Sequence, residues 1–184
     1  FKDGTGQFID FYENNQKSYE VVYKDGIGKE TYWYENGQKW TELNFTDGKL
    51  DGKSTEWDEN GKIKIERLYE NGQIDYEGNF KDGKLDGKST VWDENGQIQN
   101  ELTYKDGKEF GLTKYEYYTN GQIKSEDYID EKKRSKSTSW YENGQKKSEE
   151  NWTDWIAKNG KWTEWYENGQ KLWEANWKDG KLNG

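Results

Sequence analysis

Short runs of aromatic and polar residues alternate along this chain with Asn-Gly and Asp-Gly pairs. Such pairs, flanked by polar and aromatic residues, are the strongest short-range signal of a β-hairpin, because a type I′ turn needs positive φ at both central residues. No segment shows a convincing helical period. The pattern therefore predicts an all-β chain of hairpins with essentially no helix.

One phrase accounts for half of the turns. It reads aromatic residue, Tyr or Asp, Glu, Asn, Gly, Gln, and Lys or Ile, with small departures in single copies. Its eight copies are residues 11–17, 33–39, 57–63, 68–74, 92–98, 117–123, 140–146 and 165–171. A second phrase, an aromatic residue followed by Lys or Thr, Asp and Gly, occurs between most of these copies. A fixed recurrence of this kind indicates a repeat architecture.

The repeats form one continuous array over residues 1–184 by this interpretation, with about eight units of about 23 residues, each containing two strands and two turns. The interval between Gly61 and Gly72 is only 11 residues, because the second phrase is missing there, so a half-repeat is expected near 61–72. Glu131 and Trp155 interrupt the turn pattern, and longer, looser turns are expected near both. Since the last phrase ends where another strand should begin, we expect a fragment of a longer array.

The register follows if each pair is a two-residue turn. Trp33 then lies opposite Trp40, Tyr34 opposite Lys39, Phe45 opposite Leu50, and Trp40 opposite Thr55. Trp33 and Trp40 would share one face of the sheet, and Tyr34, Leu43, Phe45 and Leu50 the other. A bulge at either turn would invert this assignment.

The expected fold is an elongated, twisted single antiparallel meander of stacked β-hairpins, similar to a solenoid. Open sheets of more than about 10 strands rarely stay flat, and each hairpin would contact only its neighbours. The core must be aromatic, because 11 Trp, 14 Tyr and 6 Phe residues outnumber the aliphatic ones.

Composition and charge exclude several classes of function. The chain has no His, Cys or Met, so it lacks an imidazole base, a thiol nucleophile and the usual zinc ligands. Its net charge of −9 repels nucleic acids and anionic lipid surfaces. No apolar run approaches the length of a membrane-spanning helix. The basic cluster Lys132, Lys133, Arg134 and Lys136 is interpreted as a solvated loop.

The two phrases, such as Trp140 to Lys146 and Phe80 to Gly87, resemble the bacterial variant of the MORN repeat. The resemblance covers nearly the whole chain. It implies a hairpin-stacked β-rod used for protein interaction, with no catalytic residue, cofactor or metal site to carry over. Some bacterial chains of this type resemble antitoxin or immunity proteins, and others are similar to secreted or surface proteins of host-associated bacteria.

Tryptophans are concentrated in the last repeats, where they form either the core or a binding surface. Trp is enriched at binding hot spots. Trp155 fits no repeat position and is therefore the first candidate. The candidate partner-binding residues are Trp155, Trp162, Trp165, Trp173 and Tyr166.

Carboxylates such as Asp51, Glu56, Asp58 and Glu59 could in principle form a catalytic acid/base pair or bind calcium. However, Asp-Glu-Asn-Gly recurs at a fixed phase, as turn chemistry requires, whereas a catalytic pair would occur once. These carboxylates are therefore interpreted as turn residues.

We expect a non-catalytic protein-interaction module, without nucleic acid or membrane insertion. The alternatives are an acidic antitoxin with a basic partner and a glycan-binding or cell-wall-binding module. Exposed strand edges also allow edge-to-edge or end-to-end self-association. A secreted or cell-surface location is slightly favoured over the cytoplasm.

Overall fold

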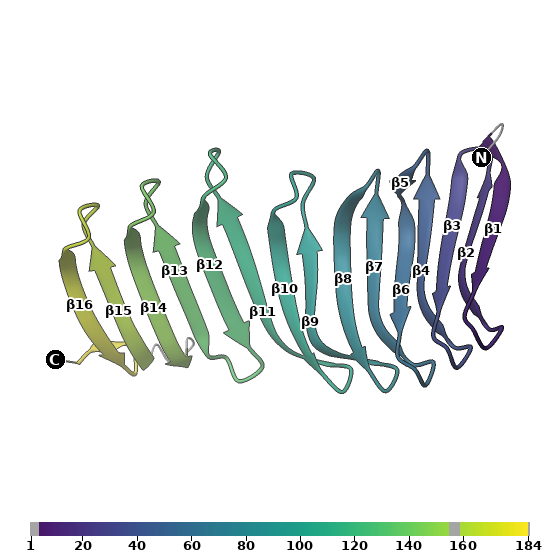
Figure 1. The fold of residues 1–184 in the computed structure, drawn as a ribbon. Helices are drawn as coiled ribbons and strands as arrows, with labels where there is room; N and C mark the ends of the chain where they lie inside the picture. Colours follow the sequence, from purple (N-terminus) through teal and green to yellow (C-terminus); the bar gives the residue numbers. More distant parts are fainter. Residues whose placement is uncertain (1–3, 155–158, 184) are drawn as a thin grey trace. The chain divides into compact units, whose positions relative to one another are not determined.

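The computed structural model describes residues 4–154 and 159–183, and these residues form strands and turns without any helix (Figure 1). The 17 strands follow one another as an antiparallel meander. Their bounds are β1 (Gly6–Phe11), β2 (Lys17–Lys24), β3 (Ile27–Trp33), β4 (Lys39–Thr46), β5 (Lys49–Leu50), β6 (Gly52–Trp57), β7 (Ile63–Glu70), β8 (Gln73–Lys81), β9 (Lys84–Trp92), β10 (Ile98–Lys105), β11 (Lys108–Tyr117), β12 (Ile123–Asp130), β13 (Ser135–Trp140), β14 (Lys146–Asp154), β15 (Asn159–Trp165), β16 (Lys171–Lys178) and β17 (Lys181–Leu182). The predicted all-β meander of stacked hairpins is confirmed for the described residues.

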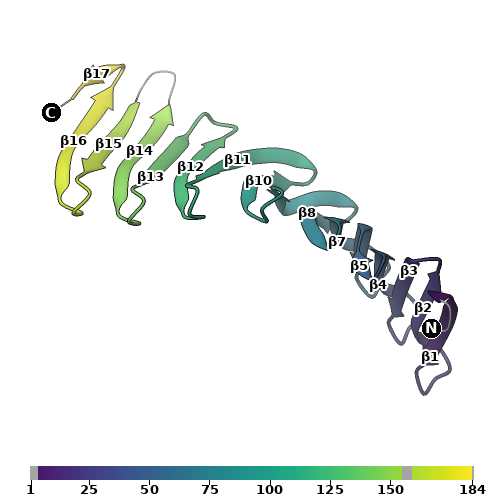
Figure 2. The ribbon, with the colours of Figure 1, turned by 90° about the horizontal axis from the view of Figure 1, so that it is seen from above.

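The chain divides into two compact units. The first comprises residues 1–96 and 104–108, and the second residues 97–103 and 109–184. Within the first unit, β1 to β9 follow in order, with the short β5 beside β4 and β6 also paired with β4. Within the second unit, each strand from β12 to β17 pairs with the next one, and the short β17 ends the series (Figure 2).

The Asp-Gly pairs form the expected two-residue turns. Asp47 has a φ of 49° and Gly48 a φ of 78°, as a type I′ turn requires. Phe45 consequently lies opposite Leu50, which confirms that part of the predicted register.

The Asn-Gly pairs mostly form a different turn. The amide of Tyr34 donates to the carbonyl of Gln38 (2.9 Å), and the amide of Gly37 donates back to the carbonyl of Tyr34 (2.9 Å). Gly37 alone takes positive φ (81°), so the loop has three residues and ends in a bulge. The Asn36 side chain favours this turn because its Oδ1 accepts the Gln38 amide proton.

The three-residue turn overturns the register predicted around Trp33. Trp33 lies opposite Lys39, so neither the pair with Trp40 nor the pair of Tyr34 with Lys39 forms. Glu42, not Trp40, lies opposite Thr55. The Trp40 ring instead lies 6.1 Å from the rings of Tyr32 and Tyr34. The predicted sharing of one face by Trp33 and Trp40 is therefore wrong, because the bulge adds one residue.

Side chains of the turn phrase tie several repeats to the next one. The hydroxyl of Tyr141 donates to the carbonyl of Trp165 (3.0 Å), and the amide of Asn143 donates to the carbonyl of Glu167 (3.1 Å). The same tyrosine bond joins Tyr12 to Trp33, Tyr34 to Trp57, and Tyr118 to Trp140. These bonds explain why the phrase recurs at a fixed phase along the chain.

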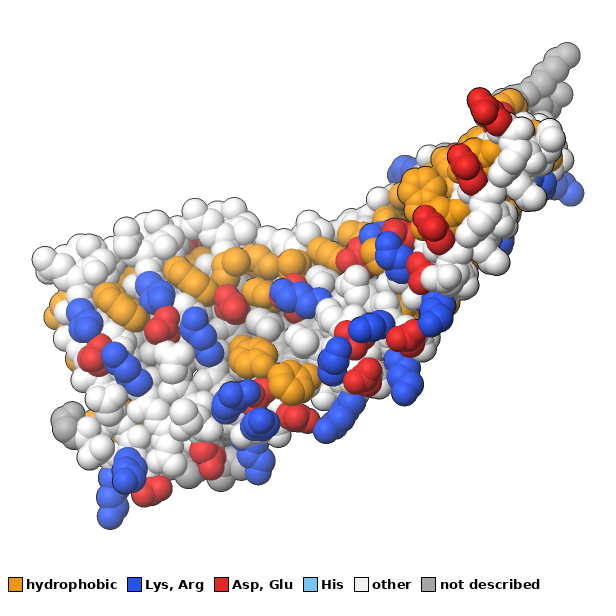
Figure 3. All heavy atoms as spheres, turned by 60° about the horizontal axis from the view of Figure 1, so that its bottom comes forward, with side chains coloured by type: hydrophobic (Ala, Val, Ile, Leu, Met, Phe, Trp, Pro, Cys, Tyr) orange, Lys and Arg blue, Asp and Glu red, His pale blue; other side chains and the backbone are white. Residues whose placement is uncertain are grey.

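One face of each repeat carries a row of Thr and Glu side chains, which we call the Thr–Glu face. In the first unit Thr31 and Thr55 are buried on either side of Glu42, which forms ion pairs with Lys29 and Lys39. In the second unit the row is Glu126, Thr138, Glu149, Thr163 and Glu174. Figure 3 shows positive and negative side chains interspersed in this way beside hydrophobic ones.

Lysines also cover tryptophan rings of the turn phrase. The ammonium groups of Lys17, Lys39 and Lys146 lie 5.4, 5.6 and 5.4 Å from the ring centroids of Trp33, Trp57 and Trp165, respectively. Each lysine belongs to the repeat before the tryptophan that it covers. The pairs therefore add a cation–π contact to the hydrogen bonds between repeats.

The half-repeat moves the Thr–Glu row to the opposite face within the first unit. Asn71 has a φ of 51°, so Asn71-Gly72 is a two-residue turn and β8 is an additional strand. Glu66 lies opposite Gly78, but the next Thr–Glu pair is Glu77 with Thr90. Because neighbouring residues on a strand point to opposite faces, Glu66 and Glu77 lie on different sides of the sheet.

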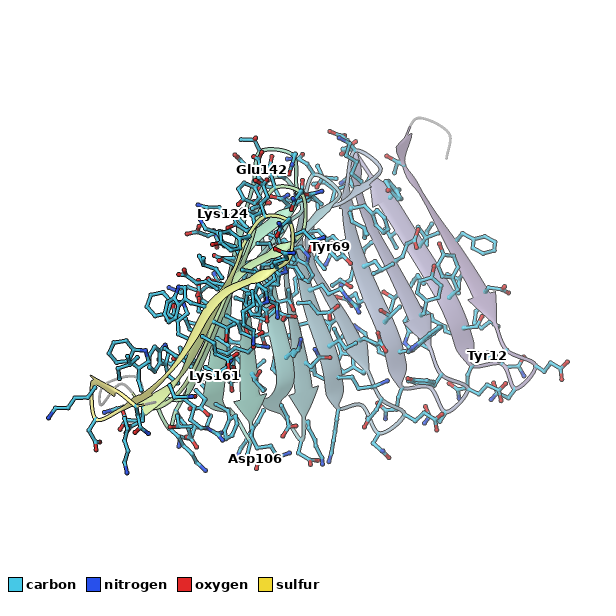
Figure 4. All side chains as sticks on the ribbon, turned by 90° about the vertical axis from the view of Figure 1, so that its left-hand side faces the viewer. Tyr12, Tyr69, Asp106, Lys124, Glu142 and Lys161 are labelled. Atoms are coloured by element: carbon cyan, nitrogen blue, oxygen red, sulfur yellow. The ribbon has the colours of Figure 1, made fainter. Side chains whose placement is uncertain are left out.

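This reversal is also visible at the ends of the strands. In Figure 1 the turns after β3 and β6 lie at the lower edge, and the turn after β9 lies at the upper edge. Figure 4 shows Tyr12 at one edge of the first unit and Tyr69 towards the other. Arg67 joins the two parts of the unit, since its Nε donates to Glu77 (2.7 Å).

A buried carboxylate holds the turn that contains Glu131. Oδ1 of Asp130 accepts the amides of Lys132 and Arg134 (both 2.9 Å), and Oδ2 accepts Nε of Arg134 (2.6 Å). Lys133 takes the left-handed position (φ 62°) that glycine occupies in other three-residue turns. Burial raises the pKa of Asp130, but the bonds from Arg134 and Lys132 outweigh it and lower that pKa.

Candidate binding pocket of the second unit

The face of the second unit opposite the Thr–Glu face carries four tryptophans, Trp152, Trp162, Trp173 and Trp177, and we call it the tryptophan face. Two neighbouring rows of cross-strand pairs between β12 and β16 contain three of these tryptophans, and Trp173 lies in a further row, opposite Glu164. The first row is Asp127, Ser137, Glu150, Trp162 and Ala175, and the second is Ile129, Ser135, Trp152 in β14, Gly160 and Trp177. Large and small residues therefore alternate along the second row, and small residues, Ser137 and Ala175, also occur in the first.

This alternation leaves a hollow of about 480 Å³, which we call the tryptophan pocket. Its lining residues are Asp127, Tyr128, Ser135, Lys136, Ser137, Glu150, Trp152, Trp162 and Trp177. Position 160, opposite Trp152, requires glycine. A Cβ at this position would lie 2.7 Å from Cε3 of Trp152 and 2.1 Å from the carbonyl oxygen of Asn151. Ala175, opposite Trp162, is buried and leaves room for the indole.

Two of the four indole N–H groups have carboxylate partners. Trp152 donates to Glu150 (3.0 Å), and Trp173 donates to Glu164 (2.6 Å). The rings of Trp162 and Trp173 lie 5.0 Å apart in a tilted arrangement. Nε1 of Trp162 and of Trp177 is buried and has no hydrogen-bond partner among the described residues. A buried donor without a partner costs about 1 to 3 kcal/mol, so packing of these rings overrides hydrogen bonding.

The charges on the two faces differ. Strand alternation places Asp127 and Glu150 on the tryptophan face and Lys136 on the Thr–Glu face. There, Lys146, aided by Lys136, lowers the pKa of Glu149. The carboxylates on the pocket side therefore have no lysine from these rows beside them.

The structure separates the residues expected to bind a partner. It brings Trp162 and Trp173 together on the tryptophan face. Trp165 lies on the Thr–Glu face under Lys146, and Tyr166 lies in a turn with half of its surface exposed (50%). Trp155 lies outside the described residues.

The candidate partner-binding residues predicted from the sequence did not include Trp152, Trp177 or Glu150. A signal for all three was present in the spacing, because Glu150, Trp152 and Trp177 fall on one face if the strands alternate and the hairpin register is known. The sequence after Asp154 departs from both turn phrases, and the register could not be read from it.

Of the carboxylates weighed as a catalytic pair, Asp58 serves a turn, but Glu56 does not: it lies within β6 and pairs with Lys64 and Arg67. Oδ1 of Asp58 accepts the amides of Asn60 and Lys62 (both 2.9 Å). These hydrogen bonds lower the pKa of Asp58, and the bond from the Lys62 amide has the largest effect. Within residues 4–154 and 159–183, no group of three or more carboxylates is arranged to hold a metal ion. The same residues include no helix with the length and apolarity needed to cross a membrane.

Comparison with known proteins identifies the repeat. The family described as MORN repeat variant matches residues 27–47, 50–71, 65–82, 85–106, 113–130, 136–154 and 158–179. No curated protein matches the chain.

Two solved structures are similar over part of the chain. One is described as a GtfA/B complex bound to UDP and GlcNAc (14% identity, TM-score 0.27, covering 61% of this chain and 22% of that one). The other is accessory secretory protein 1, 2 and 3 of Streptococcus pneumoniae (15% identity, TM-score 0.22, covering 64% and 19%). The chain thus spans about a fifth of the length of each.

Proposed function

Because the chain belongs to the MORN repeat variant family, we propose that it is a non-catalytic repeat module that binds a protein partner through the tryptophan face of its second unit. The observation that carries this proposal is the tryptophan pocket, an apolar hollow of about 480 Å³ with Trp152, Trp162 and Trp177 in its lining. Binding energy at protein interfaces is concentrated in buried aromatic residues at well-packed pockets.

The other tryptophan sites support this choice of face. Trp33, Trp57 and Trp165 are each covered by a lysine of the preceding repeat, and their carbonyls accept hydrogen bonds from tyrosines. These residues hold the repeats together. The tryptophans of the pocket make no equivalent contact among the described residues, so they are available for a partner.

The test compares partner capture by matched variants of the full chain. Trp162→Ala and Trp177→Ala remove pocket rings, and Trp40→Ala removes a more exposed indole (45%) from the first unit. Each variant is first checked for folding by circular dichroism and thermal unfolding. We expect the pocket variants to lose at least ten times more affinity for the captured protein than Trp40→Ala, since hot-spot truncations cost about 2 kcal/mol or more. Equal binding by all folded variants would contradict the proposal.

The acidic composition favours a basic partner, and an antitoxin role is the narrower form of this proposal. The net charge of −9 predicts association that weakens steeply as salt concentration rises. A captured basic toxin whose activity is lost in the complex would establish the narrower role. Capture that does not depend on salt would argue against it.

A further inference from the structure

The chain itself shows how its tryptophans bind cations. In three repeats a lysine ammonium lies 5.4 to 5.6 Å from the centroid of an indole ring. Lys39 and Lys146 are also ion-paired, at 2.6 Å, with Glu42 and Glu149. An indole ring and a carboxylate thus hold one ammonium group between them.

The tryptophan pocket contains the same two kinds of group, and strand alternation places the one lysine of its lining, Lys136, on the opposite face of the sheet. Glu150 lies on the same face as Trp152 and Trp162, and the Trp152 indole fixes Oε2 of its carboxylate. Asp127 adds a second carboxylate to the lining. Among the described residues, no ammonium or guanidinium group lies over Trp152, Trp162 or Trp177.

We propose that the tryptophan pocket takes a lysine or arginine side chain presented by a basic protein partner. The inference rests on the proposed function and names the chemistry of its partner. The indole rings supply cation–π attraction, and Glu150 and Asp127 supply the opposite charge. Hydroxyl groups of Ser135 and Ser137 border the same hollow. The net charge of −9 attracts such a partner from a distance.

The experiment titrates the full chain with a blocked peptide, acetyl-Gly-Gly-Arg-Gly-Gly-amide, and with the same peptide carrying citrulline, the neutral isostere of arginine. Binding is followed by the indole ¹H–¹⁵N resonances, assigned through single tryptophan variants. We expect the arginine peptide to shift the resonances of Trp152, Trp162 and Trp177 and the citrulline peptide to bind about 3- to 30-fold more weakly.

A matched pair of carboxylate variants locates the charge that is recognised. Glu150→Gln keeps an acceptor for the Trp152 indole but removes the charge, and we expect it to weaken the arginine peptide about 3- to 30-fold. Glu149→Gln makes the same change on the opposite face and should leave binding within about twofold, since that carboxylate already pairs with Lys146.

Other outcomes would overturn the inference. Equal shifts with arginine and citrulline peptides, or an equal loss in Glu149→Gln and Glu150→Gln, would show that the pocket does not recognise a cation. Tighter binding of tetramethylammonium or of a chito-oligosaccharide than of the arginine peptide would assign the pocket to a small quaternary ammonium or to a glycan. If the peptide fails but Trp162-dependent protein capture persists, this inference falls and the proposed function stands.

Discussion

The tyrosine of the turn phrase provides a direct test of how the repeats are held together. Tyr141→Phe removes a single hydroxyl, which donates to the carbonyl of Trp165 in the next repeat (3.0 Å, partly buried). The ring and the turn remain in place. The only change is the loss of one hydrogen bond between repeats.

The expected loss of stability follows from that bond. A hydrogen bond contributes about 1 kcal/mol net, and a carbonyl left partly buried without its partner adds to the cost, so Tyr141→Phe should lose about 1 to 2 kcal/mol. For a chain of this size, that lowers the unfolding midpoint by about 2 to 8 °C. The free energy of unfolding in urea gives the same quantity independently, provided the slope is unchanged.

The chain offers a matched control in the final copy of the phrase. Tyr166 occupies the same turn position, but half of its surface is exposed (50%) and its hydroxyl has no partner among the described residues. Tyr166→Phe should change stability by less than about 0.5 kcal/mol, as surface substitutions usually do. Equal losses in Tyr141→Phe and Tyr166→Phe, or no loss in either, would refute this explanation of the repeat.

Two further substitutions test the turn and the ion pairs. Gly37→Ala should lower the free energy of unfolding in urea by about 1 to 2 kcal/mol, because Gly37 has a left-handed φ of 81°. Asn15→Gly, at the equivalent position (φ 62°), should not lower it. Equal effects of the two substitutions would contradict the turn assignment. Hydrogen bonds from Lys171 and Lys161 lower the pKa of Glu174 from 4.5 to about 2, so its charge stabilises the fold above pH 4.5 and this contribution is lost as the pH falls towards 2. Glu174→Gln should therefore lower the urea midpoint at neutral pH but not at about pH 2, and a difference that persists in acid would refute the pairing.

Hairpin turns and repeat phase were predictable because they depend on local chemistry. Asp47-Gly48 formed the expected two-residue turn, and Asn15 took the left-handed φ that glycine takes elsewhere. Asn36-Gly37 did not form one, because the Asn side chain can cap a three-residue loop as readily as its backbone can enter a type I′ turn. The dipeptide alone does not distinguish these outcomes.

One bulged residue is enough to invert a face, and for this reason the surface was harder to predict than the strands. The register error at Trp33 carried over to Trp40, and the reversal between Glu66 and Glu77 depends on a single additional strand. The candidate binding residues do not all lie on one face, and the reason is simpler. Trp162 and Trp165 are three residues apart, so alternation alone places them on opposite faces.

Site-specific photo-crosslinking tests most directly whether the tryptophan face binds a protein. A photo-reactive amino acid is placed at Ser137, in the lining of the tryptophan pocket, and separately at Glu142, in an exposed turn of the same unit (Figure 4). We expect a crosslinked protein from position 137 that disappears when Trp162 is replaced by alanine, and no such product from position 142. The same protein crosslinked from position 142 but not from position 137 would place the binding surface elsewhere and contradict the proposed function.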